Sequence, residues 1–271
     1  MNVDLHCHSN ASDGILTPNE LVELAIERKV DLLSITDHDT LNAYHDIADS
    51  PHMQLVRGIE LSSSWRNLDI HIVGLNLDIS HQSILTAVQL HTVARAKRAE
   101  QIAAKLDSQG IKDSLEGVRI EAGCGQIGRL HFARYLVRIG AAKTIQKAFK
   151  KYLSEGKAGD TEACWAAMGS VITWIEEAGG TAVLAHPAKY RLTRTKLNLL
   201  ISDFKDFNGK AIEVISGRQD KNLTYELASL ANKYQLLASC GSDFHVPNFP
   251  WADLGQVEKL PTDCLPVWED W

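Results

Sequence analysis

The sequence lacks any run of about 18 apolar residues, which is the length that a transmembrane helix requires. Its first residues contain neither a basic segment nor an apolar core, so nothing there resembles a secretory signal. Internal repeats and low-complexity segments are absent as well. We therefore expect a globular protein that works in the cytoplasm and does not enter a membrane.

Cysteine is scarce and shows no pairing pattern. The five cysteines are odd in number, widely spaced and free of CxxC motifs. Because disulfides are rare in the cytosol, we expect reduced thiols. Cys7 stands between two candidate metal ligands, but the alternation of side chains along a strand would direct it to the opposite face and into the core.

The net charge is modestly negative, and the charges are unevenly distributed. The whole chain carries -6, whereas residues 91–160 contain 14 basic and 7 acidic side chains. That segment therefore has a local balance of +7, and the remainder has one of -13. An acidic body with a basic segment fits a metal-rich site under a cover that attracts anions. A solvated helical face would produce the same clustering.

Seven short apolar segments have the length and composition of buried strands. They cover residues 3–7, 31–36, 53–61, 69–77, 181–185, 211–215 and 236–240. Helix signals follow several of them, including a proline in the first turn near residue 18 and a periodic pattern over residues 222–234. Parallel strands separated by helices indicate an α/β protein with a (β/α) barrel, whose active site lies at the carboxyl ends of the strands.

The alternation of strands and helices is interrupted in the middle of the chain. Helices are predicted over residues 83–107, 130–139 and 142–153, with a glycine-rich break at 121–125. We expect a barrel formed by residues 1–89 and 161–271, and a helical insert at 90–160 that covers the active site. The tail is rich in proline and tryptophan and is expected to lie on the surface.

Nine histidine and carboxylate side chains fall at or just after the predicted strands. In two pairs, His6 with His8 and Asp243 with His245, the spacing of two residues directs both side chains to one face of a strand. The complete set of candidate metal ligands is His6, His8, Asp13, His38, Glu60, His71, His186, Asp243 and His245. Such a mixture favours Mn, Fe, Zn or Ni over Mg or Ca. With Glu60 or Asp243 as a bridge, nine ligands could hold two or three ions.

Other polar residues near these motifs allow more than one role. Asp37 and Asp39 could orient a ligand imidazole or cap the next helix, and we favour capping for Asp39. The histidines without a partner pattern, which are expected at the surface, are His45, His52, His81 and His91.

Together these motifs resemble the PHP (polymerase and histidinol phosphatase) family of metal-dependent phosphoesterases. The segments that carry the resemblance are Asp4-Leu5-His6-Cys7-His8, Ser12-Asp13-Gly14, Asp37-His38-Asp39, Gly58-Ile59-Glu60, His71-Ile72-Val73-Gly74, His186-Pro187 and Asp243-Phe244-His245. The resemblance implies a distorted seven-stranded barrel with a trinuclear site, usually of manganese, iron or zinc. It implies one ion on His6, His8, Glu60 and Asp243, a second on Asp13, His38 and His245, and a third on Glu60, His71 and His186. In catalysis we expect Glu60 and Asp243 to act as bridging ligands, and His245 or a metal-bound water to act as the general acid.

The insert resembles a subgroup that acts on nucleotide 3′,5′-bisphosphates and on 5′-phosphorylated RNA ends. Arg129, His131 and Arg134 match its motif and are candidate substrate ligands, because an arginine fork binds phosphate in a bidentate manner. His131 and Arg134 also share one face of a helix. Helix capping and ordinary surface charge are the alternative roles. Lys97 and Arg98 on the long helix are weaker candidates.

We therefore predict a hydrolase that removes the 3′-phosphate from 3′,5′-nucleotide bisphosphates, or that degrades short 5′-phosphorylated RNA in the 5′-to-3′ direction. It would use two or three divalent ions, with Mn preferred over Fe or Zn, and would need no obligate protein partner. The alternatives are a small-metabolite phosphomonoesterase of the histidinol-phosphatase type, an accessory PHP domain, and an amidohydrolase. An amidohydrolase usually has a lysine between two metals, and no lysine falls at the end of a predicted strand. Lys189 replaces an arginine of the subgroup, which leaves its role open.

Overall fold

The computed structural model describes residues 1–271 except 46, 48–51, 155, 162–164 and 270. Cys164 lies outside the described residues, and the other four cysteines are free thiols. Cys7 is fully buried in the core, as predicted. No helix in the described part of the chain is long and apolar enough to cross a lipid bilayer.

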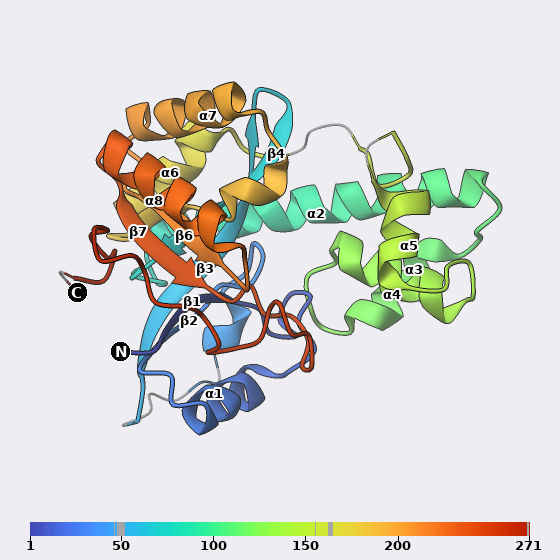
Figure 1. Cartoon of the computed structure of the whole chain (residues 1–271). Helices are drawn as coiled ribbons and strands as arrows, with labels where there is room; N and C mark the ends of the chain where they lie inside the picture. Colours follow the sequence, from blue (N-terminus) through green and yellow to red (C-terminus); the bar gives the residue numbers. More distant parts are fainter. Residues whose placement is uncertain (46, 48–51, 155, 162–164, 270) are drawn as a thin grey trace.

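Seven strands form one sheet in which each strand pairs with the next in sequence. They are β1 (Val3–Cys7), β2 (Leu32–Ile35), β3 (Gln54–Trp65), β4 (Leu68–Leu75), β5 (Thr181–Leu184), β6 (Ala211–Ser216) and β7 (Leu237–Gly241). Contacts between the two edges nearly close the sheet, since the His8 amide donates to the Phe244 carbonyl at 2.8 Å and the Asp243 amide to the His6 carbonyl at 2.7 Å. The predicted seven-stranded barrel is confirmed (Figure 1).

The prediction that all strands run parallel is wrong at β4, which is antiparallel to both of its neighbours. A two-residue turn joins β3 to β4, and Arg66 and Asn67 in this turn have φ values of 47° and 65°. Such a turn forms a hairpin, whereas a parallel pair needs a long crossover. Because β3 continues to Trp65, Glu60 lies inside β3 and His71 inside β4, not at strand ends.

Closure of the barrel depends on a glycine at the end of β7. A Cβ atom on Gly241 would lie 2.3 Å from the Cβ of His6. A residue without a side chain is therefore needed for β7 to approach β1. This approach brings His6 and His8 close to Asp243 and His245, although more than 230 residues separate the two pairs in the sequence.

Helices cover the barrel and form the insert. The α-helices in the described residues are α1 (Pro18–Glu27), α2 (Gln82–Ser108), α3 (Ser114–Ala122), α4 (Arg129–Arg138), α5 (Ile145–Ala148), α6 (Met168–Glu177), α7 (Arg194–Asp206) and α8 (Lys221–Tyr234). Shorter helical segments are η1 (Asn42–Tyr44), η2 (Phe149–Leu153) and η3 (Pro187–Tyr190). The helices predicted at 83–107 and 130–139 correspond to α2 and α4, and the one at 142–153 is divided between α5 and η2. No predicted helix corresponds to α3 or α7.

The molecule has two hydrophobic cores, which α2 connects. Ile84 and Ala87 near the start of α2 pack in the core of the barrel. Ala99 and Ile102 farther along belong to a second core, whose buried residues lie between positions 99 and 158. Figure 1 shows α3, α4 and α5 gathered around the far half of α2, beside the barrel. The predicted boundary at residue 90 therefore falls inside one continuous helix.

Candidate metal centre and its cavity

All nine predicted metal ligands lie together at one end of the barrel. Their donor atoms form four overlapping groups whose members lie within 4.8 Å of one another. The groups are His8, Asp13, His38 and His245; His6, Glu60 and His186; His6, His8 and Asp243; and His38, Glu60 and His71. The groups share members, so the centre is one continuous cluster, and the division of ligands among individual ions stays a prediction.

Glu60 is the middle of this cluster. Its Oε1 atom lies 2.9 Å from both His71 Nδ1 and His186 Nε2. Its Oε2 atom lies 2.9 Å from His38 Nδ1 and 3.4 Å from His6 Nε2. One carboxylate thus faces imidazoles from several strands and loops, which is the arrangement of a bridging ligand.

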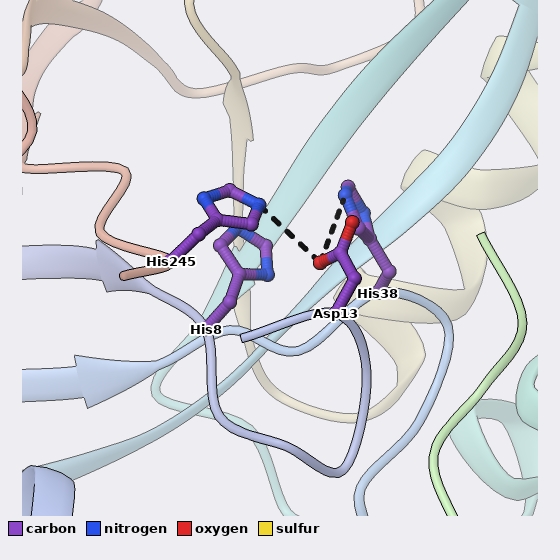
Figure 2. Close-up of side chains that lie close together, drawn as sticks. All are labelled: His8, Asp13, His38 and His245. Atoms are coloured by element: carbon purple, nitrogen blue, oxygen red, sulfur yellow. Dashed lines mark ion pairs between the residues drawn. The ribbon is translucent and has the colours of Figure 1, made fainter. Parts of the chain in front are cut away.

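Asp13 is the carboxylate of the group that Figure 2 shows, with His8, His38 and His245. Its Oδ1 atom lies 3.3 Å from His245 Nε2 and 4.0 Å from His38 Nε2. The His8 and His245 rings stack with centroids 4.1 Å apart. Ligands that come from the loop after β1, the loop after β2 and the segment after β7 therefore converge on one point.

The chemistry of this donor set fits divalent cations. Among the described residues, the buried atoms Asp13 Oδ1 and Glu60 Oε2 accept no hydrogen bond of good geometry, although imidazole nitrogens lie 3.3 Å and 2.9 Å from them. Burial of a carboxylate oxygen that lacks a well-aligned donor costs free energy, and a bound cation would offset this cost. Histidine nitrogen and carboxylate oxygen are ligands that suit Mn, Fe and Zn. The nine side chains could therefore hold divalent metal ions.

The pKa values of the cluster show how strongly its members interact. Burial by itself raises the pKa of Glu60, but His38 and His71 outweigh it and hold the pKa well below its usual range. Burial is the largest influence on His8 and lowers its pKa to about 3. Burial also disfavours the charged form of His245, but Asp13 opposes it and raises the pKa of His245 to about 9. Ionised carboxylates and neutral imidazoles are the forms that bind metals, so an ion would displace a proton from His245.

Glu213 on β6 supports the ligands and was not among the predicted site residues. Its Oε1 lies 2.9 Å from His6 Nδ1, and its Oε2 accepts the His186 amide at 2.6 Å. A carboxylate on Nδ1 directs Nε2 of the same ring toward a metal. The available sequence signal was an acidic residue inside the otherwise apolar strand at 211–215.

Asp37 holds the loop that carries Asp13. It accepts the Ser9 amide at 2.8 Å and the Ser9 and Ser12 hydroxyls at 2.5 Å each. Burial raises its pKa to about 6. Gly14 completes this loop, because a Cβ atom there would lie 2.2 Å from the His8 carbonyl oxygen. Asp37 therefore positions a ligand through the backbone of its loop.

The predicted helix-capping role of Asp39 is wrong. Its side chain accepts the Ser62 amide at 2.7 Å and Arg95 Nε at 2.6 Å, and His91 Nε2 lies 3.8 Å away. His91 is fully buried, with its ring nitrogens 2.8 Å from the Ala87 carbonyl and 2.7 Å from the Ser62 carbonyl. The surface prediction is therefore wrong for His91 as well, because the inner face of α2 packs this ring against β3.

The other three unassigned histidines lie nearer the surface. His45 and His52 are exposed, as predicted. His81 is half-buried, and its Nδ1 accepts the Ser83 amide at 3.3 Å at the start of α2. It therefore caps a helix, which its position just before the predicted helix could have indicated.

Lys189 on η3 reaches the metal cluster, although it follows no strand directly. Its Nζ atom forms an ion pair with Oδ2 of Asp243. This contact differs from the lysine of an amidohydrolase, because Lys189 pairs with one carboxylate and does not lie between two metal positions. Its side chain is half exposed.

A cavity of about 840 Å³ extends from the metal cluster to the insert. Asp13, His38, His71, Asp243 and His245 form its metal-ligand end. Four arginines also line it, namely Arg95, Arg98, Arg129 and Arg134. Aliphatic and aromatic side chains of the insert, including Ile102, Phe132 and Phe149, line another part of it, and the segment after β7 also contributes. Three of the predicted insert residues, Arg98, Arg129 and Arg134, therefore share one cavity with five of the predicted ligands.

The four arginines differ in their pairing. Arg95 pairs with Asp39, and Arg98 Nη1 lies 3.0 Å from Asp69 Oδ2. Both guanidinium groups also lie over the Trp165 ring, at 5.4 Å and 5.3 Å. Arg95 was not predicted, although its spacing of three from Arg98 places both on one helix face. Lys97 is exposed and is not among the residues that line the cavity.

The two outer arginines are more available to a ligand. Arg134 Nη2 donates to the Asp13 carbonyl at 2.7 Å. Arg129 is exposed at the start of α4. Neither forms an ion pair within the described residues, so their charges face the cavity without a carboxylate of their own.

His131 has a different environment from the two arginines. Its ring is buried, and its Nδ1 accepts the Gly128 amide at 3.0 Å at the start of α4. Burial lowers its pKa to about 4. His131 is not among the residues that line the cavity, so its predicted contact with substrate has no direct geometric support.

Comparisons with known proteins agree with this architecture. The model of the PHP domain matches residues 4–157. A 5'-3' exoribonuclease, Rnm, of Escherichia coli (strain K12) is 42% identical, and the match covers 99% of this chain and 93% of that protein. A 3',5'-nucleoside bisphosphate phosphatase of Chromobacterium violaceum is 38% identical, over 99% of this chain and 96% of that one.

A solved structure from Chromobacterium violaceum, described as an amidohydrolase with bound sulfate, superposes with a TM-score of 0.92. It is 38% identical, and the match covers 99% of this chain and 95% of that one. The fold, the ligand set and these relatives confirm the prediction of a hydrolase that acts on phosphoric esters. The chain belongs to the PHP family.

Proposed function

We propose that this protein removes the 3′-phosphate from nucleoside 3′,5′-bisphosphates and releases nucleotides from short 5′-phosphorylated RNA in the 5′-to-3′ direction. One observation carries the proposal: a single cavity is lined by the metal cluster and by four arginine side chains of the insert. A substrate that extends from one to the other must carry two anionic groups. The two relatives with these activities, at 42% and 38% identity, support the same substrate class.

We propose two or three divalent ions at the cluster, with manganese preferred over iron or zinc. When bound, such ions would activate water and neutralise the charge of the scissile phosphate. Asp13, Glu60 and Asp243 provide the carboxylates that would hold them, with Glu60 in the central position. The six imidazoles of the cluster would complete the coordination.

The remaining residues bind and orient the substrate in this proposal. Arg129 and Arg134 would hold the phosphate that does not react, since their guanidinium groups face the cavity. His245 lines the same cavity and is a candidate donor of the proton to the leaving ribose oxygen. His131 would act indirectly, by fixing the start of α4 from which Arg129 and Arg134 project.

We also propose that the enzyme works in the cytoplasm and needs no obligate protein partner, because this one chain supplies both ends of the cavity. The sulfate bound in the Chromobacterium violaceum structure has the shape of a phosphate, which is consistent with anion binding in this fold. That protein is described as an amidohydrolase, so cleavage of C–N bonds is an alternative activity to be tested beside hydrolysis of the phosphoester substrates.

The test is product release with added Mn²⁺ from adenosine 3′,5′-bisphosphate, from a short 5′-phosphorylated RNA and from a simple phosphomonoester. Loss of the 3′-phosphate from the bisphosphate, together with stepwise mononucleotide release from the RNA, would support the proposal. Equal turnover of the simple ester would instead favour a metabolite phosphatase of the histidinol-phosphatase type. If protein of verified metal content hydrolyses none of these phosphoesters, both functions are contradicted.

A further inference from the structure

An aromatic pair, the half-buried Phe249 and the exposed Trp251, lines the cavity in the segment that follows β7. Phe249 and Trp251 line the cavity together with the metal ligands Asp243 and His245. Their rings are 4.3 Å apart at an interplanar angle of 63°. Trp251 is 53% exposed although it lines the cavity, so it lies where the cavity opens to solvent.

Backbone hydrogen bonds hold this segment in place, while about half of the Trp251 side chain is open to solvent. Pro247 and Pro250 flank Phe249, and each fixes its own φ angle. The Trp251 carbonyl accepts the Arg218 amide at 2.7 Å, and the Ala252 amide donates to the Phe249 carbonyl at 3.0 Å. An aromatic platform on a fixed backbone binds a flat ligand with little loss of conformational entropy.

This inference rests on the proposed function, which determines how an RNA chain would run through the cavity. An enzyme that works from the 5′ end cleaves between the first and second nucleotides. If Arg129 and Arg134 hold the 5′-phosphate inside the cavity, the first nucleotide occupies the space between the arginines and the metal cluster. The second nucleotide must then leave past the metal cluster toward solvent, which is where the exposed Trp251 lies beside Phe249.

We propose that Trp251 and Phe249 form a stacking site for the base on the 3′ side of the scissile phosphate. Every base has a π face, so such a site accepts RNA of any sequence. The site would distinguish RNA from a nucleoside bisphosphate, which has no second base. It therefore makes this segment a determinant of substrate preference between the two proposed activities.

The test compares Trp251→Ala, Trp251→Phe and the unaltered protein on three substrates. These are adenosine 3′,5′-bisphosphate, a 5′-phosphorylated dinucleotide, and the same dinucleotide with an abasic second residue. Loss of one base stack costs about 1–3 kcal/mol, or roughly 5- to 150-fold. We expect Trp251→Ala to lower kcat/KM for the dinucleotide by about this factor, relative to kcat/KM for the bisphosphate. Trp251→Phe should retain most of the kcat/KM for the dinucleotide.

The abasic substrate isolates the stacking contact. In the unaltered protein, removal of the second base should lower kcat/KM by a similar factor. In Trp251→Ala, removal of the second base should cause no further decrease. Tyr225→Ala is the matched control, because Tyr225 on α8 is 64% exposed and is not among the residues that line the cavity. This control should leave all three rates unchanged.

Two results would overturn the inference, and they differ from each other. If Trp251→Ala lowers turnover of the dinucleotide and of its abasic form equally, no base stacks on this residue, while the proposed function stands. If the unaltered protein hydrolyses neither nucleotide substrate, the proposed function fails and the stacking site fails with it. Circular dichroism of each variant, together with its turnover of the bisphosphate, would show whether it is folded.

Discussion

The carboxylate of Glu213 on β6 lies 2.9 Å from Nδ1 of His6 on β1, and both side chains are buried. The same carboxylate accepts the backbone amide of His186 at 2.6 Å. One residue outside the ligand set therefore fixes the orientation of two ligands that are 180 residues apart. The metal centre consequently depends on a strand that contributes no ligand of its own.

Replacement of Glu213 should weaken metal binding. Glu213→Gln keeps the shape of the side chain but loses the charge that makes His6 more basic at Nε2. We expect metal affinity to fall about 10- to 100-fold, the usual effect of removing such a support. Titration of metal-free protein with Mn²⁺ in a calorimeter measures this directly, independently of activity.

Glu226→Gln is the control for this change, because Glu226 is an exposed residue of α8. It should bind metal like the unaltered protein. Unchanged metal affinity in Glu213→Gln would show that the His6 ring is held by its packing alone.

Replacement of Arg134 should impair substrates with two phosphates more than those with one. Arg134→Ala removes a guanidinium that faces the cavity, and a hydrogen bond to a charged group contributes about 1.5–3 kcal/mol. We expect kcat/KM for adenosine 3′,5′-bisphosphate to fall roughly 10- to 150-fold. Steady-state rates on the bisphosphate and on a simple phosphomonoester give the comparison.

Two controls separate phosphate binding from damage to the metal site. Because Arg134 also donates to the Asp13 carbonyl, the metal content of the variant must be measured. Arg138→Ala, on the same helix but exposed and paired with Glu121, should have little effect. An equal loss on both substrates in Arg134→Ala would contradict a role in holding the second phosphate.

His131 should make the stability of the fold depend on pH. Burial is the largest influence on its pKa, and Arg134 and Arg95 act in the same direction against Asp13 and Glu121, so the pKa falls from 6.5 to about 4. The folded state therefore binds a proton less readily than the unfolded state does. The contribution of neutral His131 to the free energy of unfolding is therefore present above pH 6.5 and is lost as the pH falls toward 4.

His131→Gln removes this titration. We expect the difference in unfolding free energy between the unaltered protein and the variant to shrink as the pH falls from 7 to 4.5, by at most about 1.4 kcal/mol per pH unit. Urea denaturation at a series of pH values measures the difference. The exposed His45→Gln is the control, and its difference should stay constant. A constant difference for His131→Gln would refute the prediction.

Removal of the metal ions should reduce both activity and stability. A ligand that binds only the folded state contributes about 2.7 kcal/mol when it is present at 100 times its Kd. Chelation should therefore lower the melting temperature by several degrees and abolish phosphoester hydrolysis. Addition of Mn²⁺, Fe²⁺ or Zn²⁺ to separate samples should restore both, and the rank order of restored rates would test the proposed preference for manganese. Full activity in protein shown to be free of metal would contradict the assignment of the cluster.

The ligand set could be predicted from the sequence because its motifs are local. His6-x-His8 and Asp243-x-His245 each place two ligands within three residues, so the members of each pair stay close whatever the rest of the chain does. Only His6 lies on a strand, whereas His8, Asp243 and His245 follow the ends of β1 and β7. The long helix α2 and the barrel strands were also predictable, since their hydrophobic patterns depend only on neighbouring residues.

The supporting residues could not be predicted in this way. Glu213 acts on His6, and Arg95 acts on Asp39, across distances in sequence that no periodicity describes. His91 could be placed in the core only once α2 was known to pack against β3. The antiparallel direction of β4 followed from a two-residue turn between two segments whose apolar patterns fit either direction.

The sequence by itself therefore predicted which side chains could bind metal, because histidine and carboxylate recur in motifs next to the predicted strands. The tertiary structure decided what surrounds them. It brought Arg134 on the insert and Trp251 after β7 to the same cavity as the ligands, although the insert and the tail are far apart in the chain. Such convergence depends on how the strands close into a barrel and where α2 directs the insert, and both result from packing between distant segments.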